Sequence, residues 1–298
     1  MKYHQLGNSD LHISTIGFGC MSLSDNQTSN EQILHKAIDL GINFFDTADL
    51  YQKGWNETSV GQALKSKRKD LVIATKVGNQ WRPDGSGWDW NPNKDYILKC
   101  VEESLTRLQT DYIDLYQLHG GTIDDPIDDT IAAFEQLKQQ GKIRYYGISS
   151  IRPNVIREYI KRSNIVSVMM QYSLLDRRPE ETCLSLLQQH HIGVLARGPV
   201  AQGLLVNKPA KPYLNYSAEQ VQQAAVAVQT VSNKQRNAAQ TAIQFVLDHP
   251  AVTAAIPGIR TLQQLEEAVQ AVEALMLTKE DMHLLQQSIP ANTYEQHR

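Results

Sequence analysis

Four side chains suited to proton transfer follow short apolar segments in the first half of the chain: Asp46, Tyr51, Lys76 and His119. Each lies at or just after the carboxyl end of a strand-like run. A carboxylate, a phenol, an ammonium and an imidazole at one place can deliver a proton to a reacting oxygen. Because the carboxyl ends of parallel strands in an α/β barrel converge on one face, these residues can meet there despite their spacing.

The four residue types suggest a division of roles. A free tyrosine has a pKa of about 10 and is a poor acid at neutral pH. An ammonium beside it stabilises the phenolate, so we expect Lys76 to lower the pKa of Tyr51. We expect Asp46 to keep Lys76 charged and oriented, and His119 to hydrogen-bond the substrate oxygen. Taken singly, each residue also has a structural interpretation, such as a helix N-cap for Asp46 or a buried structural histidine for His119.

Strand-like segments alternate with helical patterns along most of the chain. Eight segments are predicted as strands: Ile16–Gly19, Asn43–Asp46, Leu71–Lys76, Ile113–His119, Tyr145–Ser149, Val166–Tyr172, Gly193–Arg197 and Thr253–Ile256. Alternation of this kind indicates βαβ units and a parallel sheet, and eight units indicate closure into a (β/α)8 TIM barrel. Within the third and fourth strands, Lys76 and His119 continue the residues that point inward, since side chains alternate between faces.

Other segments complete the predicted architecture. Two short pieces, Lys2–Gln5 and Leu11–Ser14, flank a turn and predict a β-hairpin that caps the bottom of the barrel. Apolar residues at helical spacing predict helices through Ile97, Val101, Leu105 and Leu108, and through Leu262, Leu265, Val269, Val272 and Met276. No linker interrupts the pattern, so residues 1–298 are expected to form a single domain.

Two connections are longer than a barrel requires, Gly78–Asn93 and Gln202–Ser217. Long irregular loops in a compact domain are usually binding loops or lids. Both follow strands and should therefore lie on the catalytic face. The first contains Trp81, Trp88 and Trp90, for which we weigh a substrate-binding role equally against packing within the loop.

Composition limits the partners of the chain. A formal net charge of −3 provides no basic surface for nucleic acid or an anionic membrane. No apolar run is long enough to span a bilayer, and the first residues lack a signal-peptide pattern. Cys20, Cys100 and Cys183 are too widely spaced to suggest a zinc site or a disulfide framework, so we expect no bound metal and a cytoplasmic location.

Several ordered segments resemble the aldo-keto reductase family. They include FFDTADLY, IATK and DYIDLYQLH, which carry the four residues above, and TIGFGCMSL, YYGISS, QYSLLDR, ARGPVAQGLL and IPGIRTLQQLEE elsewhere. The resemblance covers most of the chain in the order and approximate spacing of the family. It implies a proton-donor role for Tyr51 in a tetrad with Asp46, Lys76 and His119. It also implies a nicotinamide cofactor, since no side chain supplies a hydride.

The resemblance assigns most of the predicted cofactor site. The Ile256–Arg260 segment leads into a helix whose amino end and arginine suit a phosphate. Gly203 and Leu204 resemble a segment that folds over a pyrophosphate, with Lys208 nearby. The full predicted set is Cys20, Met21, Asp46, Ser149, Met169, Gln171, Arg197, Gly198, Pro199, Gly203, Leu204, Lys208, Pro257, Gly258, Ile259, Arg260, Gln264, Glu267 and Ala268. No G-x-G-x-x-G motif follows a strand, which argues against a Rossmann domain.

The sequence departs from the family pattern around the expected nicotinamide. Ser150 and Ala268 each replace an asparagine, and Met169 replaces a glutamine. Gln171 lies on the same strand face as Met169, so either residue is a candidate for the carboxamide. Arg197 stands where a tyrosine usually stacks on the ring, and a planar guanidinium can also stack. A surface ion pair is the alternative role for Arg197.

The resemblance implies reduction of aldehydes or ketones with NADPH. Two alternatives remain open. One is a non-catalytic member of the family that binds the cofactor on behalf of a partner protein, and the other is an unrelated barrel lyase that binds no NADPH.

Overall fold

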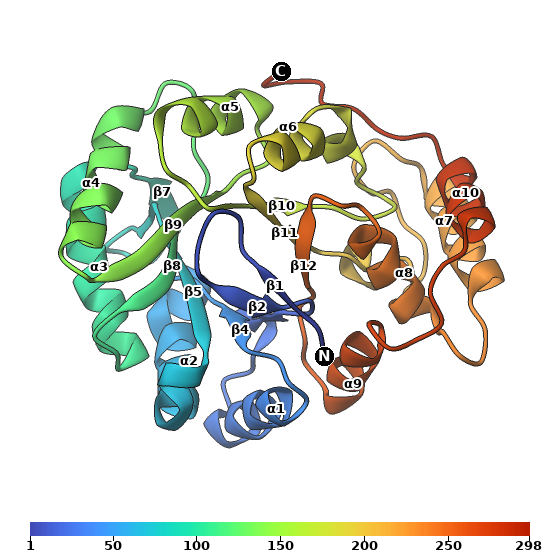
Figure 1. Cartoon of the computed structure of the whole chain (residues 1–298), viewed down its shortest axis with the longest axis horizontal. Helices are drawn as coiled ribbons and strands as arrows, with labels where there is room; N and C mark the ends of the chain where they lie inside the picture. The colour runs from blue at the N-terminus through green and yellow to red at the C-terminus, as the bar shows by residue number, and fades with distance from the viewer.

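Eight parallel strands form the centre of the computed structural model, which describes all 298 residues (Figure 1). Their bounds are β3 Phe18–Gly19, β4 Phe44–Asp46, β5 Val72–Val77, β8 Ile113–Leu118, β9 Ile143–Ser149, β10 Ser167–Gln171, β11 Gly193–Arg197 and β12 Val252–Ile256. The segment just before β3 meets β12 through a parallel bridge between Ile16 and Ala255, and the Gly17 amide donates to the Ala255 carbonyl at 2.9 Å. This bridge closes the sheet, and the predicted (β/α)8 barrel is confirmed.

Alternating side chains divide the apolar core into two parts. Val72, Ala74 and Leu115 point into the barrel and belong to a small cluster of 12 buried residues. Ile73 and Leu118 point outward into a cluster of 70 residues between the strands and the helices. The inward face predicted for the third and fourth strands is therefore the one observed.

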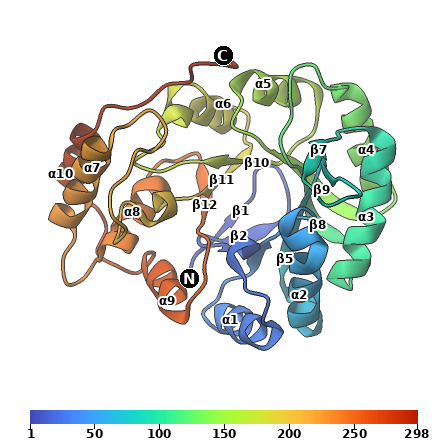
Figure 2. The same ribbon diagram turned by 180° about the vertical axis from the view of Figure 1, so that it is seen from behind.

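A helix follows each strand of the barrel, and together these helices form the outer ring seen in Figure 1. Their bounds are α1 Gln27–Asp39, α2 Trp55–Leu64, α3 Lys94–Leu108, α4 Ile127–Gln139, α5 Pro153–Arg162, α6 Cys183–Gln189, α8 Ala238–Leu247 and α9 Leu262–Gln270. Two further helices, α7 Ala218–Val231 and α10 Lys279–Ser288, pack side by side at the edge of the molecule (Figures 1 and 2). No helix is both long enough and apolar enough to cross a membrane.

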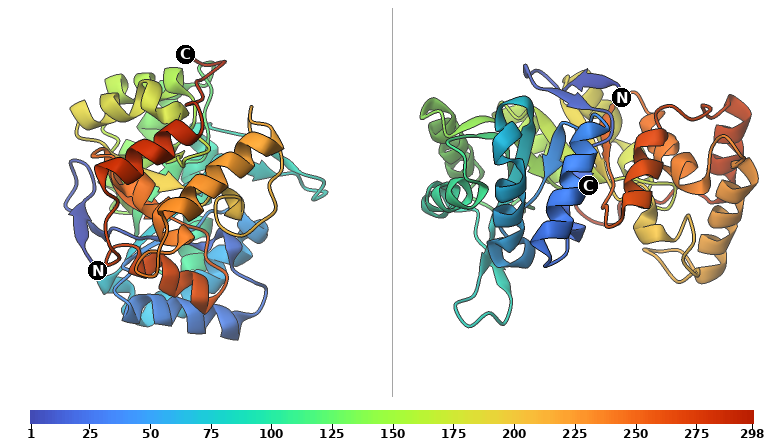
Figure 3. Two further views of the ribbon diagram at one scale, coloured as in Figure 1. Left: turned by 90° about the vertical axis from the view of Figure 1, so that its right-hand side faces the viewer. Right: turned by 90° about the horizontal axis from the view of Figure 1, so that it is seen from below.

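The hairpin of β1 Tyr3–Gln5 and β2 His12–Ser14 closes the bottom of the barrel, as predicted. Leu6, Leu11 and Ile13 belong to the inner apolar cluster, so the hairpin fills the barrel from below. In the right-hand view of Figure 3, this hairpin lies at the opposite end of the barrel from a second, protruding hairpin.

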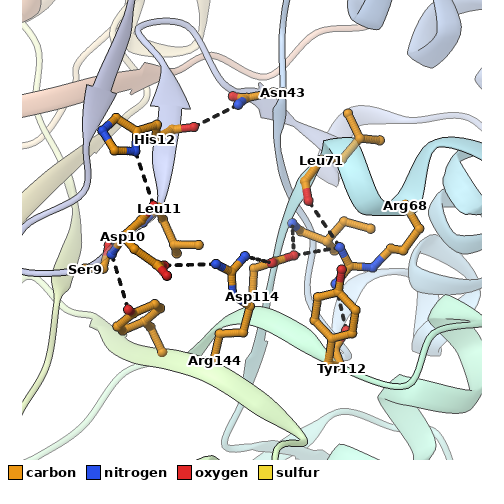
Figure 4. Close-up of polar contacts among 12 residues, drawn as sticks. Ser9, Asp10, Leu11, His12, Asn43, Arg68, Leu71, Tyr112, Asp114 and Arg144 are labelled. Carbon is orange, nitrogen blue, oxygen red and sulfur yellow. Dashed lines mark hydrogen bonds and ion pairs between the residues drawn. The ribbon is translucent and has the colours of Figure 1, made fainter.

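A buried carboxylate fastens the hairpin to the strands beside it (Figure 4). Asp114 of β8 is fully buried and accepts from Arg68 at 2.7 Å, from Arg144 at 2.8 Å and from the Ile73 amide at 3.0 Å. Arg144 also bonds Asp10 in the hairpin turn at 2.9 Å. Three donors on one carboxylate satisfy a charge that burial would otherwise make costly.

Two predictions about local structure are wrong. The segment Gly78–Asn93 is not an irregular loop, because β6 Asn79–Trp81 and β7 Trp88–Trp90 pair as an antiparallel hairpin. The last predicted apolar helix stops at Gln270, and Met276 at its expected end is exposed. Helix α9 buries only Leu265, Ala268 and Val269, so the apolar spacing beyond it does not mark a continuous helix.

Candidate active site

The carboxyl ends of β4 and β5 bring Asp46, Tyr51 and Lys76 together at the mouth of the barrel. The Lys76 ammonium donates to Asp46 Oδ2 at 2.7 Å, to the Thr47 carbonyl at 2.6 Å and to the Tyr51 hydroxyl at 3.4 Å. An ammonium has three N–H donors, so these contacts use its whole capacity. The Lys76 side chain is 1% exposed, and its position is therefore set by these three acceptors and not by solvent.

Charge pairing keeps Lys76 protonated. Burial works against its charge, but Asp46 and Tyr51 outweigh burial and the pKa of Lys76 is raised. The second oxygen of Asp46 accepts from the Gln117 side chain at 3.2 Å. Asp46 therefore holds the ammonium in its charged form, which is the role expected of it.

Tyr51 differs from the prediction in one respect. Burial raises the pKa of its phenol, and the opposing effect of Lys76 is smaller. The expectation that Lys76 brings this pKa below its ordinary value is therefore wrong for the protein without ligands. The phenol is protonated at neutral pH, and the ammonium lies where it can stabilise a phenolate once the proton has left.

His119 follows β8 directly and packs beside Tyr51. The two rings meet edge to face, with centroids 5.9 Å apart and an interplanar angle of 84°. Burial, together with the charges of Lys76 and Arg197, lowers the pKa of His119 to about 3. The imidazole is therefore neutral at physiological pH. Its buried Nδ1 has no hydrogen-bond partner.

A strained backbone turn follows Tyr51 and sets the position of its side chain in the site. Gln52 and Lys53 have φ values of 50° and 54°, in the left-handed region that side chains other than glycine rarely adopt. Contacts on both sides hold this turn. The Gln52 side chain donates to Asp25 at 2.7 Å, and the Lys53 ammonium lies 5.1 Å from the centroid of the Trp81 ring.

The three tryptophans of the β6–β7 hairpin have different surroundings. Trp81 donates from its indole to the Leu50 carbonyl at 3.2 Å, next to Tyr51. Trp90 donates to Asp125 at 3.0 Å and packs against Gly78 and Gly120. Trp88 is 48% exposed. Trp90 thus serves loop packing, whereas Trp81 and Trp88 stay candidates for substrate contact.

Polar side chains occupy the mouth ends of three neighbouring strands, β9 to β11. Gln171 and Arg197 are paired in register, and Arg197 donates to the Gln171 side-chain oxygen at 3.1 Å. The Gln171 amide nitrogen donates to the Tyr213 hydroxyl at 2.5 Å. Ser149 ends β9 beside them, while Met169 is 1% exposed inside the barrel. Between the two candidates for the carboxamide, Gln171 has the accessible position.

The segment after β11 and the start of α9 supply candidate groups for phosphates. The Lys208 side chain packs against Gly203, since its carbon atoms lie 3.3 Å from the position that a Cβ on Gly203 would take. At α9, Thr261 caps the Gln264 amide at 3.2 Å, and the Gln264 side chain accepts from the Arg260 amide at 2.9 Å. The Arg260 side chain is exposed and forms no ion pair within the protein.

The other predicted cofactor residues lie in these same connections. Cys20 and Met21 follow β3, the former buried and the latter 63% exposed. Glu267 accepts from Gln263 at 2.9 Å on α9, and Ala268 is buried in the outer core. The remaining predicted residues form the short runs after β11 and β12, namely Gly198, Pro199, Leu204, Pro257, Gly258 and Ile259.

Sequence reasoning missed several residues that shape the site. Gln117 supports Asp46, and Asn79 donates to the His119 carbonyl at 3.1 Å. Tyr213 orients Gln171 from 42 positions away. The parity of β8 places Gln117 on the inward face, so that residue had a sequence signal. Asn79 and Tyr213 had none beyond their place in long loops.

Comparison with known proteins agrees with this geometry. The model of the aldo/keto reductase family matches residues 15–290. The chain is 52% identical over 307 residues to a Bacillus subtilis protein described as an uncharacterized oxidoreductase, YqkF, with 100% of both chains covered. It is 34% identical to the NADH-specific methylglyoxal reductase of Escherichia coli, over 72% of each chain. The holo form of aldo-keto reductase AKR11C1 from Bacillus halodurans matches with a TM-score of 0.94 and 54% identity, covering 100% of this chain and 99% of that one.

The chain belongs to the aldo/keto reductase family. It is a carbonyl oxidoreductase of the type that works with a nicotinamide cofactor. The alternative of an unrelated barrel lyase is therefore wrong.

Proposed function

We propose that the protein reduces aldehydes or ketones to alcohols with NADPH, with Tyr51 as the proton donor. The observation that carries the proposal is the Lys76 ammonium, which bonds Asp46 and Tyr51 at the same time. A buried, fully bonded ammonium beside a phenol suits proton donation and has no evident structural need at a barrel mouth. A neutral His119 ring stands against the same phenol.

The mouth also fits a nicotinamide cofactor. Ser149, Gln171 and Arg197 present a hydroxyl, an amide and a guanidinium at adjacent strand ends. Arg260 and Lys208 offer positive charge for phosphates near a helix amino end and a tight glycine turn. A bound reduced nicotinamide supplies the hydride that no side chain can provide.

The protein's own groups handle the proton. Tyr51 keeps its proton in the resting enzyme because burial raises the pKa of its phenol. As negative charge develops on the substrate oxygen, the phenol donates its proton, and Lys76 stabilises the phenolate that remains. Asp46 prevents Lys76 from losing its charge during this step.

His119 orients the substrate. A neutral imidazole has one ring N–H to donate, and the carbonyl oxygen is the acceptor we assign to it. An imidazolium would compete with the phenol as an acid, and the low pKa of about 3 removes that competition. Tyr51 is then the only acid that faces the substrate oxygen.

The choice of NADPH rests on Arg260. Its exposed guanidinium has no ion-pair partner, and a guanidinium binds a phosphate through two parallel hydrogen bonds. The Escherichia coli relative is named as NADH-specific, so NADH is the alternative cofactor. Lys208 is the second candidate for the phosphate contact.

The decisive test is a turnover assay. Purified protein is mixed with NADPH or NADH and a panel of carbonyl compounds that includes methylglyoxal, and loss of the reduced cofactor is followed by absorbance. Turnover with NADPH that Tyr51→Phe abolishes supports the proposal. Cofactor binding without turnover of any carbonyl compound would instead favour the non-catalytic alternative, in which the protein binds cofactor for a partner.

We also propose the setting of the activity. Residues 1–298 act as one domain, and the substrate is a small carbonyl compound rather than nucleic acid or a membrane component. The buried free thiols of Cys20, Cys100 and Cys183 support a reducing cytoplasm as the location.

A further inference from the structure

Arg197 is a half-buried cation at the mouth of the barrel without a counter-ion. Its guanidinium forms one side-chain hydrogen bond, to the neutral amide oxygen of Gln171 at 3.1 Å. No carboxylate lies within ion-pair distance of it. Its charge acts on the site: it adds to the burial that lowers the pKa of His119, and it partly opposes the burial that raises the pKa of Tyr51 and Asp46. A guanidinium keeps its proton at any physiological pH, so this charge is permanent.

The other titratable groups at the mouth contribute no net charge. Lys76 and Asp46 form a buried pair 2.7 Å apart with no net charge. Tyr51 and His119 are neutral, because burial raises the pKa of the phenol and lowers that of the imidazole. Burial also raises the pKa of nearby Asp49, which disfavours its carboxylate form. Arg197 therefore gives the mouth a net positive charge.

Neighbouring side chains hold Arg197 in this position. The Tyr213 hydroxyl accepts from Gln171 Nε2 at 2.5 Å, which leaves the Gln171 oxygen facing the guanidinium. Tyr213 itself is held by paired backbone hydrogen bonds with Tyr216, at 3.1 and 3.0 Å. Because both polar ends of the Gln171 amide are engaged, its orientation is defined, and so is that of Arg197.

A permanent positive charge affects the binding of the two redox forms of a nicotinamide differently. The reduced ring is neutral, whereas the oxidised ring is a pyridinium cation. Given a nicotinamide bound at this mouth, as in the proposed function, we propose that Arg197 makes the enzyme bind the reduced cofactor more tightly than the oxidised one. The charge thus favours the substrate form of the cofactor and release of its product form.

The expected size follows from Coulomb's law. Two unit charges a few ångströms apart in a partly solvated site repel by enough to change an equilibrium about tenfold. A tenfold difference in affinity raises the reduction potential of the bound two-electron couple by about 30 mV. Repulsion between partly exposed charges also weakens with added salt.

Dissociation constants for NADPH and NADP+, and for NADH and NAD+, test the proposal. They are measured by quenching of tryptophan fluorescence or by calorimetry, without any carbonyl substrate. Arg197→Met removes the charge at similar length, and Arg197→Lys retains it. Gln171→Glu leaves the arginine in place but gives it a carboxylate partner. Arg260→Ala is the matched control, since it removes an arginine whose assigned contact is common to NADPH and NADP+.

The measured quantity is the affinity ratio of the reduced to the oxidised form. The ratio should fall about tenfold in Arg197→Met and in Gln171→Glu, and should persist in Arg197→Lys and Arg260→Ala. An Arg197→Met ratio equal to that of the wild type would overturn the proposal, whatever its effect on both affinities together. Failure of all four nucleotides to bind the wild type would instead refute the proposed function.

Discussion

The Lys76 ammonium lies 3.4 Å from the phenolic oxygen of Tyr51, although the two residues are 25 positions apart and lie on different elements. Strand β5 directs the Lys76 side chain to the inside of the barrel, and the strained turn after Tyr51 holds the tyrosine at the mouth. The same ammonium lies 5.0 Å from the centroid of the Tyr51 ring. The Lys76 ammonium is therefore positioned to stabilise a Tyr51 phenolate before any substrate binds.

Tyr51→Phe should lower kcat by about 10²- to 10⁴-fold, the usual contribution of a positioned general acid. The phenolic proton is needed only in the chemical step, so cofactor affinity should change by no more than a few-fold. Steady-state kinetics and a fluorescence titration with NADPH measure the two effects separately. Normal turnover by this variant would remove Tyr51 from the acid role.

Lys76→Met should both inactivate and destabilise the protein. It leaves the Asp46 carboxylate buried without its main partner, which typically costs about 3–5 kcal/mol. Urea unfolding monitored by circular dichroism measures this loss. The double variant Asp46→Asn, Lys76→Met is the control, because it removes the uncompensated charge and should recover much of the stability while remaining inactive. Equal instability of both variants would indicate a packing defect instead.

The barrel and the tetrad were predictable because each depends on local sequence. Strand parity set the inward direction of Lys76, and the positions after the strands located Tyr51 and His119. The β6–β7 hairpin was missed because its first strand, Asn79–Trp81, has no alternation of apolar and polar residues, unlike the equally short strands of the N-terminal hairpin. The sign of the Tyr51 pKa shift was missed because burial depends on the packed structure.

Long-range polar contacts were also beyond the sequence. The pairing of Arg68 with Asp114, and the chain of bonds through Tyr213, Gln171 and Arg197, join residues that no local pattern connects. Both depend on which strands become neighbours and on their register. These contacts determine which charged side chains form ion pairs, as Arg68 and Asp114 do, and which one, Arg197, has no counter-ion.

His119 should make stability depend on pH. Its folded-state pKa of about 3 lies below the unfolded value of about 6.5, so the unfolded chain binds the proton more readily. Stability is therefore complete above pH 6.5 and is lost as the pH falls from there toward 3. Between pH 6.5 and 4.5 the loss should be about 2–3 kcal/mol. His119→Gln should lack this component in urea unfolding at the two pH values, and identical pH slopes would contradict the assignment.

Asp114→Ala should destabilise the barrel bottom while leaving catalysis intact. It strips the nearly buried Arg68 of its counter-ion and should cost about 3–5 kcal/mol. Arg144 is 40% exposed, so Arg144→Met should cost no more than about 1 kcal/mol. The rate per folded molecule should be unchanged in both, since the network lies at the opposite end of the barrel from Tyr51. A large loss of kcat in fully folded Asp114→Ala would show that the two ends are coupled.

Arg260→Ala should weaken the binding of NADPH much more than the binding of NADH. The 2′-phosphate is the only difference between the cofactors, and a hydrogen bond to a charged group contributes roughly 1.5–3 kcal/mol. Affinity for NADPH should therefore fall by about ten- to a hundredfold, while affinity for NADH stays nearly constant. Contacts to the adenine and the nicotinamide are common to both cofactors, so the comparison isolates the phosphate. Equal losses for both would assign Arg260 to the start of α9, and Lys208→Ala would then be the next variant to titrate.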